Sequence, residues 1–314
     1  MTGEATAPSS PSAGAWAGSH GAMPLAGTFL AGPLERDVVL RSLVNHTVPG
    51  VEIVDPAAGT VTRPVPGTDA GMVTVAIHDD GVQIIGDADA TTVDLVREWF
   101  DLDTDVAEIA ERFADDVVLG PLVRERPAVR VIGHPDAFEA AAQTVLGQQV
   151  SLAACRTFTG RLAAAYGIAG EGGLLRFPHP AAVAAADLEE LRAAVGIPRS
   201  RARTVIALAE AFAAGLRVER HGDHAAVRAA LLALPGIGPW TVDYLALRVL
   251  RDADAYPVGD LVLRRALGGI SPAEATALGE RWRPWRAYAT MQLWTHDAAS
   301  GTASTPGPKR RSEA

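Results

Sequence analysis

The chain has 314 residues, enough for one to three domains, and its 48 % hydrophobic and 21 % charged residues are typical of a soluble globular protein. Its single cysteine, Cys155, excludes a disulfide framework, a cysteine-ligated zinc site and an iron–sulfur cluster within the chain. The N-terminus lacks the basic start and apolar core of a signal peptide, and no apolar run of about 18 residues follows. We therefore expect a cytoplasmic protein that does not enter a membrane.

The formal net charge of −9 is unevenly distributed: residues 1–119 carry −14 and residues 120–314 carry +5. An asymmetry of this size indicates that the two parts do different work. One interpretation is an acidic part that keeps the protein soluble. The other is a DNA-binding region beside an acidic module that faces away from the phosphates.

The N-terminal third predicts a tail followed by an α+β domain. Residues 1–30 are rich in Ala, Gly, Ser and Pro, which is typical of a disordered segment, and we expect the same of residues 301–314. Residues 31–112 then predict an acidic α+β domain with helices and three strands, "TVTRPV", "MVTVAIH" and "GVQIIGD". The sequence Asp79-Asp80-Gly81 predicts a hairpin turn between the last two strands.

After Pro127 the hydrophobic pattern is helical, with about nine helices separated by Gly and Pro. Asp136 is a candidate N-cap, and Glu139 three residues later predicts a capping box. This helix breaks at Gly147-Gln148-Gln149, and Ser151 is a candidate cap of the next one.

The segment "LPGIG", residues 234–238, lies between two helical patterns. Gly236 and Gly238 lack a Cβ, so backbone amides there could approach a phosphate, and the following helix adds partial positive charge at its N-terminus. Such a contact reads the DNA backbone and carries no sequence information. A plain corner between two helices, with glycine required only by the turn, explains the same residues.

Asp260 follows Pro257-Val258-Gly259 at the start of a predicted helix. Taken alone it is a common N-cap, and Arg264 one turn later could pair with it. Trp240 and Tyr244 are four residues apart and share one helix face, which suits either a core or a pocket wall.

Three separated segments carry a resemblance to a known family: "DAFEAAAQTVLGQQVSLAACR", "LPGIGPWTVDYLALRVL" and "RWRPWRAYATMQLW". With Asp260 after a Gly/Pro-rich loop, they resemble the helix-hairpin-helix/Gly-Pro-Asp DNA glycosylases, and within them the AlkA-type 3-methyladenine DNA glycosylase II family, over about residues 35–298. The resemblance implies an α+β protein: a small antiparallel-sheet domain and a mainly helical core of two subdomains. We assign these to residues 136–252, with the helix-hairpin-helix, and to residues 113–135 with 253–300.

The resemblance also implies roles for individual residues. Asp260 would be the catalytic carboxylate, and Trp240, Tyr244 and Trp294 would line a pocket for a flipped base. The expected DNA-binding residues are Gln148, Gln149, Gly236, Ile237, Gly238 and Arg264, with Gln149 at the position that fills the gap in the base stack. The carbonyls of Leu232, Leu234 and Ile237 would hold a monovalent cation. The chain departs from the family at Gln149, where leucine can stand, and at Gly259, where a second acid can stand.

The expected reaction suits a single carboxylate. A purine alkylated at N3 or N7 is cationic, so it stacks well on aromatic rings and leaves easily, and one acid can stabilise the sugar cation and orient water. Related strand-cleaving enzymes use a lysine after the hairpin, but Trp240 stands there and the only lysine is Lys309.

We therefore expect a monomeric, monofunctional glycosylase, with no cofactor, that acts on double-stranded DNA containing alkylated bases. A non-catalytic helix-hairpin-helix DNA-binding protein is the alternative. An arginine cluster, Arg199, Arg201 and Arg203, suits either phosphate contact or a solvated helix start.

Overall fold

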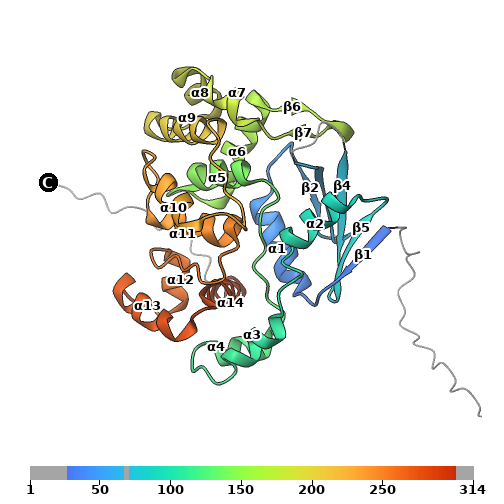
Figure 1. The fold of residues 1–314 in the computed structure, drawn as a ribbon, viewed down its shortest axis with the longest axis vertical. Helices are drawn as coiled ribbons and strands as arrows, with labels where there is room; N and C mark the ends of the chain where they lie inside the picture. The colour runs from blue at the N-terminus through green and yellow to red at the C-terminus, as the bar shows by residue number, and fades with distance from the viewer. Residues whose placement is uncertain (1–26, 67–70, 302–314) are drawn as a thin grey trace, which may run out of the picture.

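A five-stranded antiparallel sheet forms one end of the molecule in the computed structural model, which describes residues 27–66 and 71–301 (Figure 1). Its strand order is β1-β5-β4-β3-β2, with strands β1 (Gly27–Ala31), β2 (Ile53–Asp55), β3 (Thr60–Pro64), β4 (Met72–Ile77) and β5 (Gly81–Ile85). Strands β3, β4 and β5 confirm the three predicted from valine-rich runs, and Asp79 and Asp80 lie in the turn between β4 and β5 as expected.

Strand β1 corrects the predicted N-terminal boundary. Residues 27–30, which the sequence placed in a disordered tail, pair with β5 in the register Gly27 to Ile85. The segment "GTFLA" is too short and too rich in small residues to predict a strand by itself, and it forms one because β5 offers a free edge. The expected tails at residues 1–26 and 302–314 lie outside the described residues.

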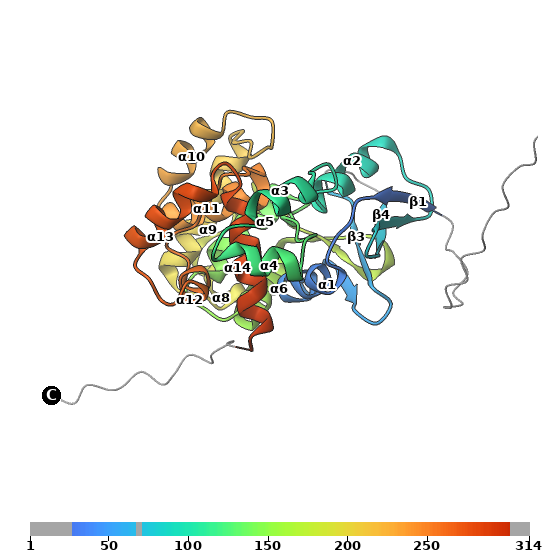
Figure 2. The ribbon, with the colours of Figure 1, turned by 90° about the horizontal axis from the view of Figure 1, so that it is seen from below.

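Two helices pack with one face of this sheet: α1 (Arg36–His46) and α2 (Ala90–Trp99). Buried residues of both helices join the inner-face side chains of the strands in one hydrophobic cluster, which includes Leu40, Val75, Ile84 and Trp99. Helix α1 also contacts α6 of the helical part, so it lies at the boundary between the two regions (Figure 2).

The rest of the described chain is mainly helical. Its helices are α3 (Val106–Phe113), α4 (Leu119–Glu125), α5 (Ala137–Gly147), α6 (Leu152–Tyr166), α7 (Pro180–Ala184), α8 (Leu188–Val195), α9 (Arg199–Ala213), α10 (His224–Leu232), α11 (Pro239–Leu245), α12 (Leu261–Ala266), α13 (Pro272–Gly279) and α14 (Arg286–Ala299). Shorter elements are β6 (Ile168–Ala169), η1 (Glu171–Gly173), β7 (Leu175–Arg176), η2 (Ala246–Leu250) and η3 (Glu280–Trp282). In the described ranges, no helix has the length and apolar character needed to cross a membrane.

The helical part differs from the sequence-based outline in three places. Helices α4 and α7 and the small β6–β7 hairpin were not predicted. The sequence predicts one helix from Trp240 onward, but the α-helix α11 ends at Leu245 and the π-helical turn η2 follows it. The buried residues of α3 pack with the helical core, although most of that helix falls within the segment 31–112 that we assigned to the N-terminal domain. One hydrophobic cluster spans both proposed helical subdomains, so their division stays a prediction.

The capping box expected at α5 does not form. Asp136 caps the helix as predicted, accepting from the Glu139 amide at 2.7 Å. The Glu139 side chain, however, is fully buried and accepts from Arg63 of β3 at 2.6 Å. A buried guanidinium partner outweighs a local bond to the Asp136 amide, which donates instead to Nδ1 of His134.

Arg63 joins the two regions of the protein. Only 2 % of it is exposed, and it binds Glu52 of the N-terminal domain at 3.2 Å as well as Glu139 of α5. Burial raises the pKa of Glu139 to about 7, while the Arg63 guanidinium opposes that shift. Since α5 leads into the loop that carries Gln148 and Gln149, this ion pair fixes the helical core against the sheet.

Candidate active site

The Asp260 carboxylate lies at the start of α12 and accepts three hydrogen bonds. Oδ1 accepts from the Leu263 amide at 2.8 Å, so Asp260 is the N-cap that the sequence predicts. Oδ1 also accepts from the indole nitrogen of Trp294 at 3.0 Å, and Oδ2 accepts from that of Trp240 at 3.2 Å. Capping alone needs only the amide bond, so the two indole donors give this partly exposed carboxylate a fixed orientation that a simple cap does not require.

The three aromatic residues expected in a pocket come together around this carboxylate. Trp240 and Tyr244 of α11 stack with ring centroids 5.4 Å apart and an interplanar angle of 28°. The ring centroid of Trp294, on α14, lies 6.0 Å from that of Tyr244. No base could fit between rings this close, so a planar ligand would stack on an outer face of the cluster. All three residues are partly exposed, as a receptor surface requires and a sealed core does not.

His46, the last residue of α1, reaches the same cluster from the N-terminal domain. The Tyr244 hydroxyl lies 3.4 Å from its Nε2. The sequence did not identify His46 as a site residue. It precedes Tyr244 by 198 positions, and a histidine at a helix end carries no distinctive pattern.

Helices α10 and α11 form the predicted hairpin around residues 234–238, and Arg228 of α10 binds Asp243 of α11 at 2.7 Å. The two glycines have different roles. Gly236 has φ +79°, and an added Cβ would lie 2.2 Å from Oγ1 of Thr204, so the turn itself requires glycine there. At Gly238 an added Cβ would meet no described heavy atom within 4 Å, which leaves that backbone open to a ligand. Ile237 is buried, so only its backbone could contact one.

The loop between α5 and α6 is fastened to this hairpin. The Gln148 amide donates to the Gly236 carbonyl and to Thr241 Oγ1, both at 3.1 Å. Arg201 of α9 donates to the Gln148 carbonyl at 2.6 Å. Gln149 is exposed at the loop tip with φ +56°, an unusual conformation for a residue other than glycine. Gln148 and Arg201 thus hold the loop, while Gln149 is presented to solvent.

Arg264, the remaining predicted DNA contact, donates from Nε to the Ile270 carbonyl at 2.7 Å. This bond ties the side chain to the turn after α12, and Arg264 forms no ion pair with Asp260 in residues 27–66 and 71–301. Of the carbonyls expected to hold a monovalent cation, Leu234 accepts from the Ile237 amide at 3.2 Å, which still leaves the oxygen a second lone pair. Carbonyl oxygens on such a tight turn suit a hard monovalent cation.

Across residues 27–66 and 71–301, no three His, Cys, Asp or Glu side chains are grouped as metal ligands.

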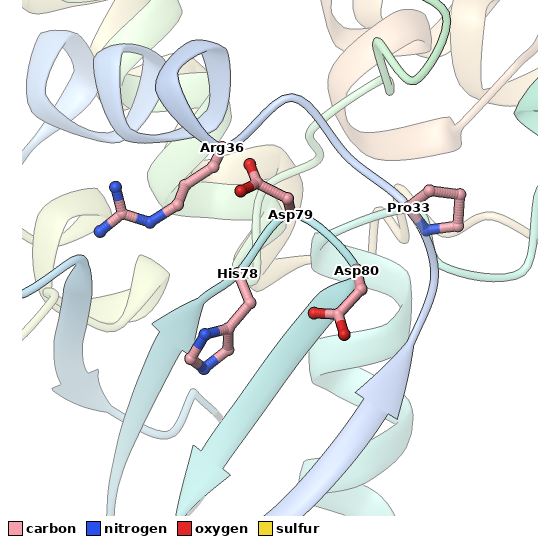
Figure 3. Close-up of a pocket in the computed structure, with 5 residues that line it drawn as sticks. All are labelled: Pro33, Arg36, His78, Asp79 and Asp80. Carbon is pink, nitrogen blue, oxygen red and sulfur yellow. The ribbon is translucent and has the colours of Figure 1, made fainter. Parts of the chain in front are cut away.

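A surface pocket of the N-terminal domain is built from other residues (Figure 3). It is lined by Pro33, Arg36, His78, Asp79 and Asp80. The backbone carbonyls of the two aspartates accept from the amides of residues 34 and 32, which fastens the β4–β5 turn to the segment before α1. The pocket has no Trp or Tyr ring that could stack on a base, so it does not suit a nucleobase.

Two sequence profiles together cover most of the chain. Residues 30–136 match the AlkA N-terminal domain, and residues 142–281 match the HhH-GPD superfamily of base excision DNA repair proteins.

The sequence is similar to those of several curated proteins. The chain is 37 % identical over 275 residues to the "Probable bifunctional transcriptional activator/DNA repair enzyme AlkA" of Mycobacterium tuberculosis. This alignment covers 84 % of this chain and 55 % of that protein. It is 38 % identical over 179 residues to DNA-3-methyladenine glycosylase 2 of Escherichia coli, an alignment that covers 56 % of this chain and 63 % of that protein. It is 30 % identical over 218 residues to a DNA-3-methyladenine glycosylase of Bacillus subtilis, and the alignment covers 64 % of this chain and 71 % of that protein. The chain thus spans about half the length of the mycobacterial relative.

Among solved structures, a 3-methyladenine DNA glycosylase from Archaeoglobus fulgidus has the same fold. The TM-score is 0.75 at 20 % identity, over 86 % of this chain and 98 % of that one.

Proposed function

The chain belongs to the HhH-GPD superfamily of base excision DNA repair proteins, and from this we propose that it is a DNA glycosylase that releases alkylated purines from double-stranded DNA. It hydrolyses the N-glycosidic bond, which is the first step of base excision repair, and it acts as a monomer. The names of the Escherichia coli and Bacillus subtilis relatives support 3-methyladenine as a substrate. The cationic character that 7-methylguanine shares with 3-methyladenine extends the class to it.

The observation that carries this proposal is the Asp260 carboxylate, fixed by two indole N–H groups within an aromatic cluster. A base inside a duplex cannot be reached, so the enzyme extrudes it. Gln149, exposed at its loop tip, fills the gap in the stack. The extruded cationic base stacks on an outer face of the cluster formed by Trp240, Tyr244 and Trp294, where a desolvated cation–π contact contributes on the order of 2 kcal/mol.

Asp260 then performs two tasks. As the bond to the charged base lengthens, positive charge develops on C1′ of the deoxyribose, and the carboxylate stabilises it. The same carboxylate orients, and accepts a proton from, the water that attacks C1′. The base leaves as a neutral molecule, and an abasic site remains in the strand.

The hairpin binds the DNA backbone near the abasic nucleotide. Amides at the open Gly238 position, at the N-terminus of α11, donate to a phosphate. A monovalent cation bound by the carbonyl oxygens of Leu232, Leu234 and Ile237 would supply positive charge to the same phosphate. Arg264 lies on α12 and adds a cation to this side of the site.

We also propose that the enzyme does not cleave the strand. A strand-cleaving mechanism needs an amine that forms a Schiff base with C1′. Trp240 occupies the position where related enzymes place it, and its indole nitrogen already donates to Asp260. Borohydride should therefore trap no covalent adduct between the protein and DNA during base release; a trapped adduct would contradict this part of the proposal.

The central experiment measures base release from methylated duplex DNA by the wild type and by Asp260→Asn. We expect the wild type to release 3-methyladenine and 7-methylguanine. The variant should lose at least 100-fold in rate while its DNA affinity is retained, because loss of the negative charge does not weaken the phosphate contacts. Equal rates would refute the role of Asp260. If the wild type binds DNA but releases no base, the protein is a non-catalytic DNA-binding protein.

A further inference from the structure

The imidazole of His46 is held in one tautomer. Its Nδ1 lies 2.8 Å from the Ser42 carbonyl oxygen, which can only accept a hydrogen bond, so Nδ1 carries the proton. In the neutral ring Nε2 then has only a lone pair. The Gln143 amide on α5 donates to the His46 carbonyl at 2.8 Å and holds the end of α1 in place.

The ring is also neutral at physiological pH. Burial, together with the nearby Arg248 guanidinium, lowers the pKa of His46 to about 4. Burial raises the pKa of Tyr244, so the phenol keeps its proton. Between these two groups, therefore, the hydroxyl of Tyr244 is the donor and Nε2 of His46 is the acceptor.

This direction determines what Tyr244 offers to a ligand. In the described chain, His46 is the only hydrogen-bond partner of the Tyr244 hydroxyl. Once the phenolic proton is directed at His46, the oxygen can offer only lone pairs to a ligand. The 3.4 Å separation is long for a hydroxyl donor, and such contacts tighten when a substrate fills the site.

We propose that His46 is a specificity-determining residue that acts through Tyr244, whose oxygen accepts a hydrogen bond from the amine at C6 of a flipped purine. A purine with a carbonyl at C6 presents an acceptor to an acceptor and gains nothing there. The inference rests on the proposed glycosylase activity and extends it: the N-terminal domain supplies the group that favours 6-amino over 6-oxo bases. It also gives that domain a role in base recognition, exerted through Tyr244.

The test compares release of 3-methyladenine, which has the amine, with release of hypoxanthine, which has the carbonyl. His46→Leu removes the acceptor at Nε2, and we expect the ratio of kcat/KM for the two bases to fall about five- to tenfold, as loss of one hydrogen bond allows. His46→Gln places an amide oxygen near the Nε2 position and should restore most of the ratio. His78→Leu, an exposed histidine of the same domain, is the matched control and should keep the wild-type ratio.

Tyr244→Phe provides a second test that leaves His46 untouched. It removes the hydroxyl and keeps the ring, so it should lower the ratio by the same factor as His46→Leu. In the Tyr244→Phe background the histidine substitution should then have no further effect on the ratio. An unchanged ratio in Tyr244→Phe, or an undiminished effect of His46→Leu in that background, overturns the inference. If the wild type releases neither base, the proposed function itself fails and this inference fails with it.

Discussion

The hydrogen bond from Trp294 to Asp260 leads to a sharp prediction for Trp294→Phe. The substitution keeps an aromatic ring for stacking but removes the indole donor that lies 3.0 Å from Oδ1. A hydrogen bond to a charged group contributes about 1.5–3 kcal/mol. The Leu263 amide still holds the same oxygen at 2.8 Å, so we take about 2 kcal/mol as the loss in transition-state stabilisation. That corresponds to a roughly 30-fold slower chemical step.

The assay is single-turnover release of 7-methylguanine from duplex DNA with the enzyme in excess. This isolates the chemical step from product release. DNA affinity, measured separately by fluorescence anisotropy, should change less than threefold, because the indole N–H faces the carboxylate. Trp285→Phe is the matched control on the same part of the chain, since Trp285 packs against Tyr288 and is not one of the described donors to the Asp260 carboxylate.

Two results would refute the reasoning. A rate for Trp294→Phe within threefold of the wild type would mean that the indole bond does not position the carboxylate for catalysis. A fall in DNA affinity as large as the fall in rate would mean that Trp294 acts in binding.

Three further predictions concern the parts that support the site. Gly236→Ala should destabilise the fold by about 1–3 kcal/mol in urea titrations, because the turn needs φ +79°, whereas Gly238→Ala should leave stability unchanged and weaken DNA binding. Arg63→Met removes the guanidinium that pairs with two buried carboxylates and should cost about 3–5 kcal/mol, against less than 1 kcal/mol for Arg97→Met at an exposed ion pair; equal losses would contradict the burial argument. The lowered pKa of His46 means that the unfolded chain binds more protons between pH 6.5 and about 4, so stability should fall as pH falls through this window, by up to about 3 kcal/mol. His46→Gln should remove that part of the slope, and an unchanged slope would show that the histidine is not neutral in the folded protein.

The sequence predicted those parts of the molecule in which local pattern decides the structure. Alternating valines and a turn signal are enough for β3, β4 and β5, and the spacing of Trp240 and Tyr244 places both rings on one helix face. The parts that escaped prediction depend on distant partners. Glu139 leaves its expected cap for Arg63, which precedes it by 76 positions, and His46 joins the cluster across 198 positions. No local rule encodes such pairings, because they arise only when the sheet and the helical core pack together.

The buried Arg63 pair has a consequence for how this protein could be divided or recombined. Its guanidinium comes from β3, and its partners come from the loop after α1 and from α5. A fragment that begins after the sheet would remove the arginine partner of Glu139 and leave only the His134 imidazole, 3.6 Å away, beside that carboxylate. A chimera that receives a relative's first domain would meet the same mismatch unless the incoming domain carries an arginine at the same place. The two regions that match separate profiles are therefore distinct in sequence, but one can be exchanged only together with the other.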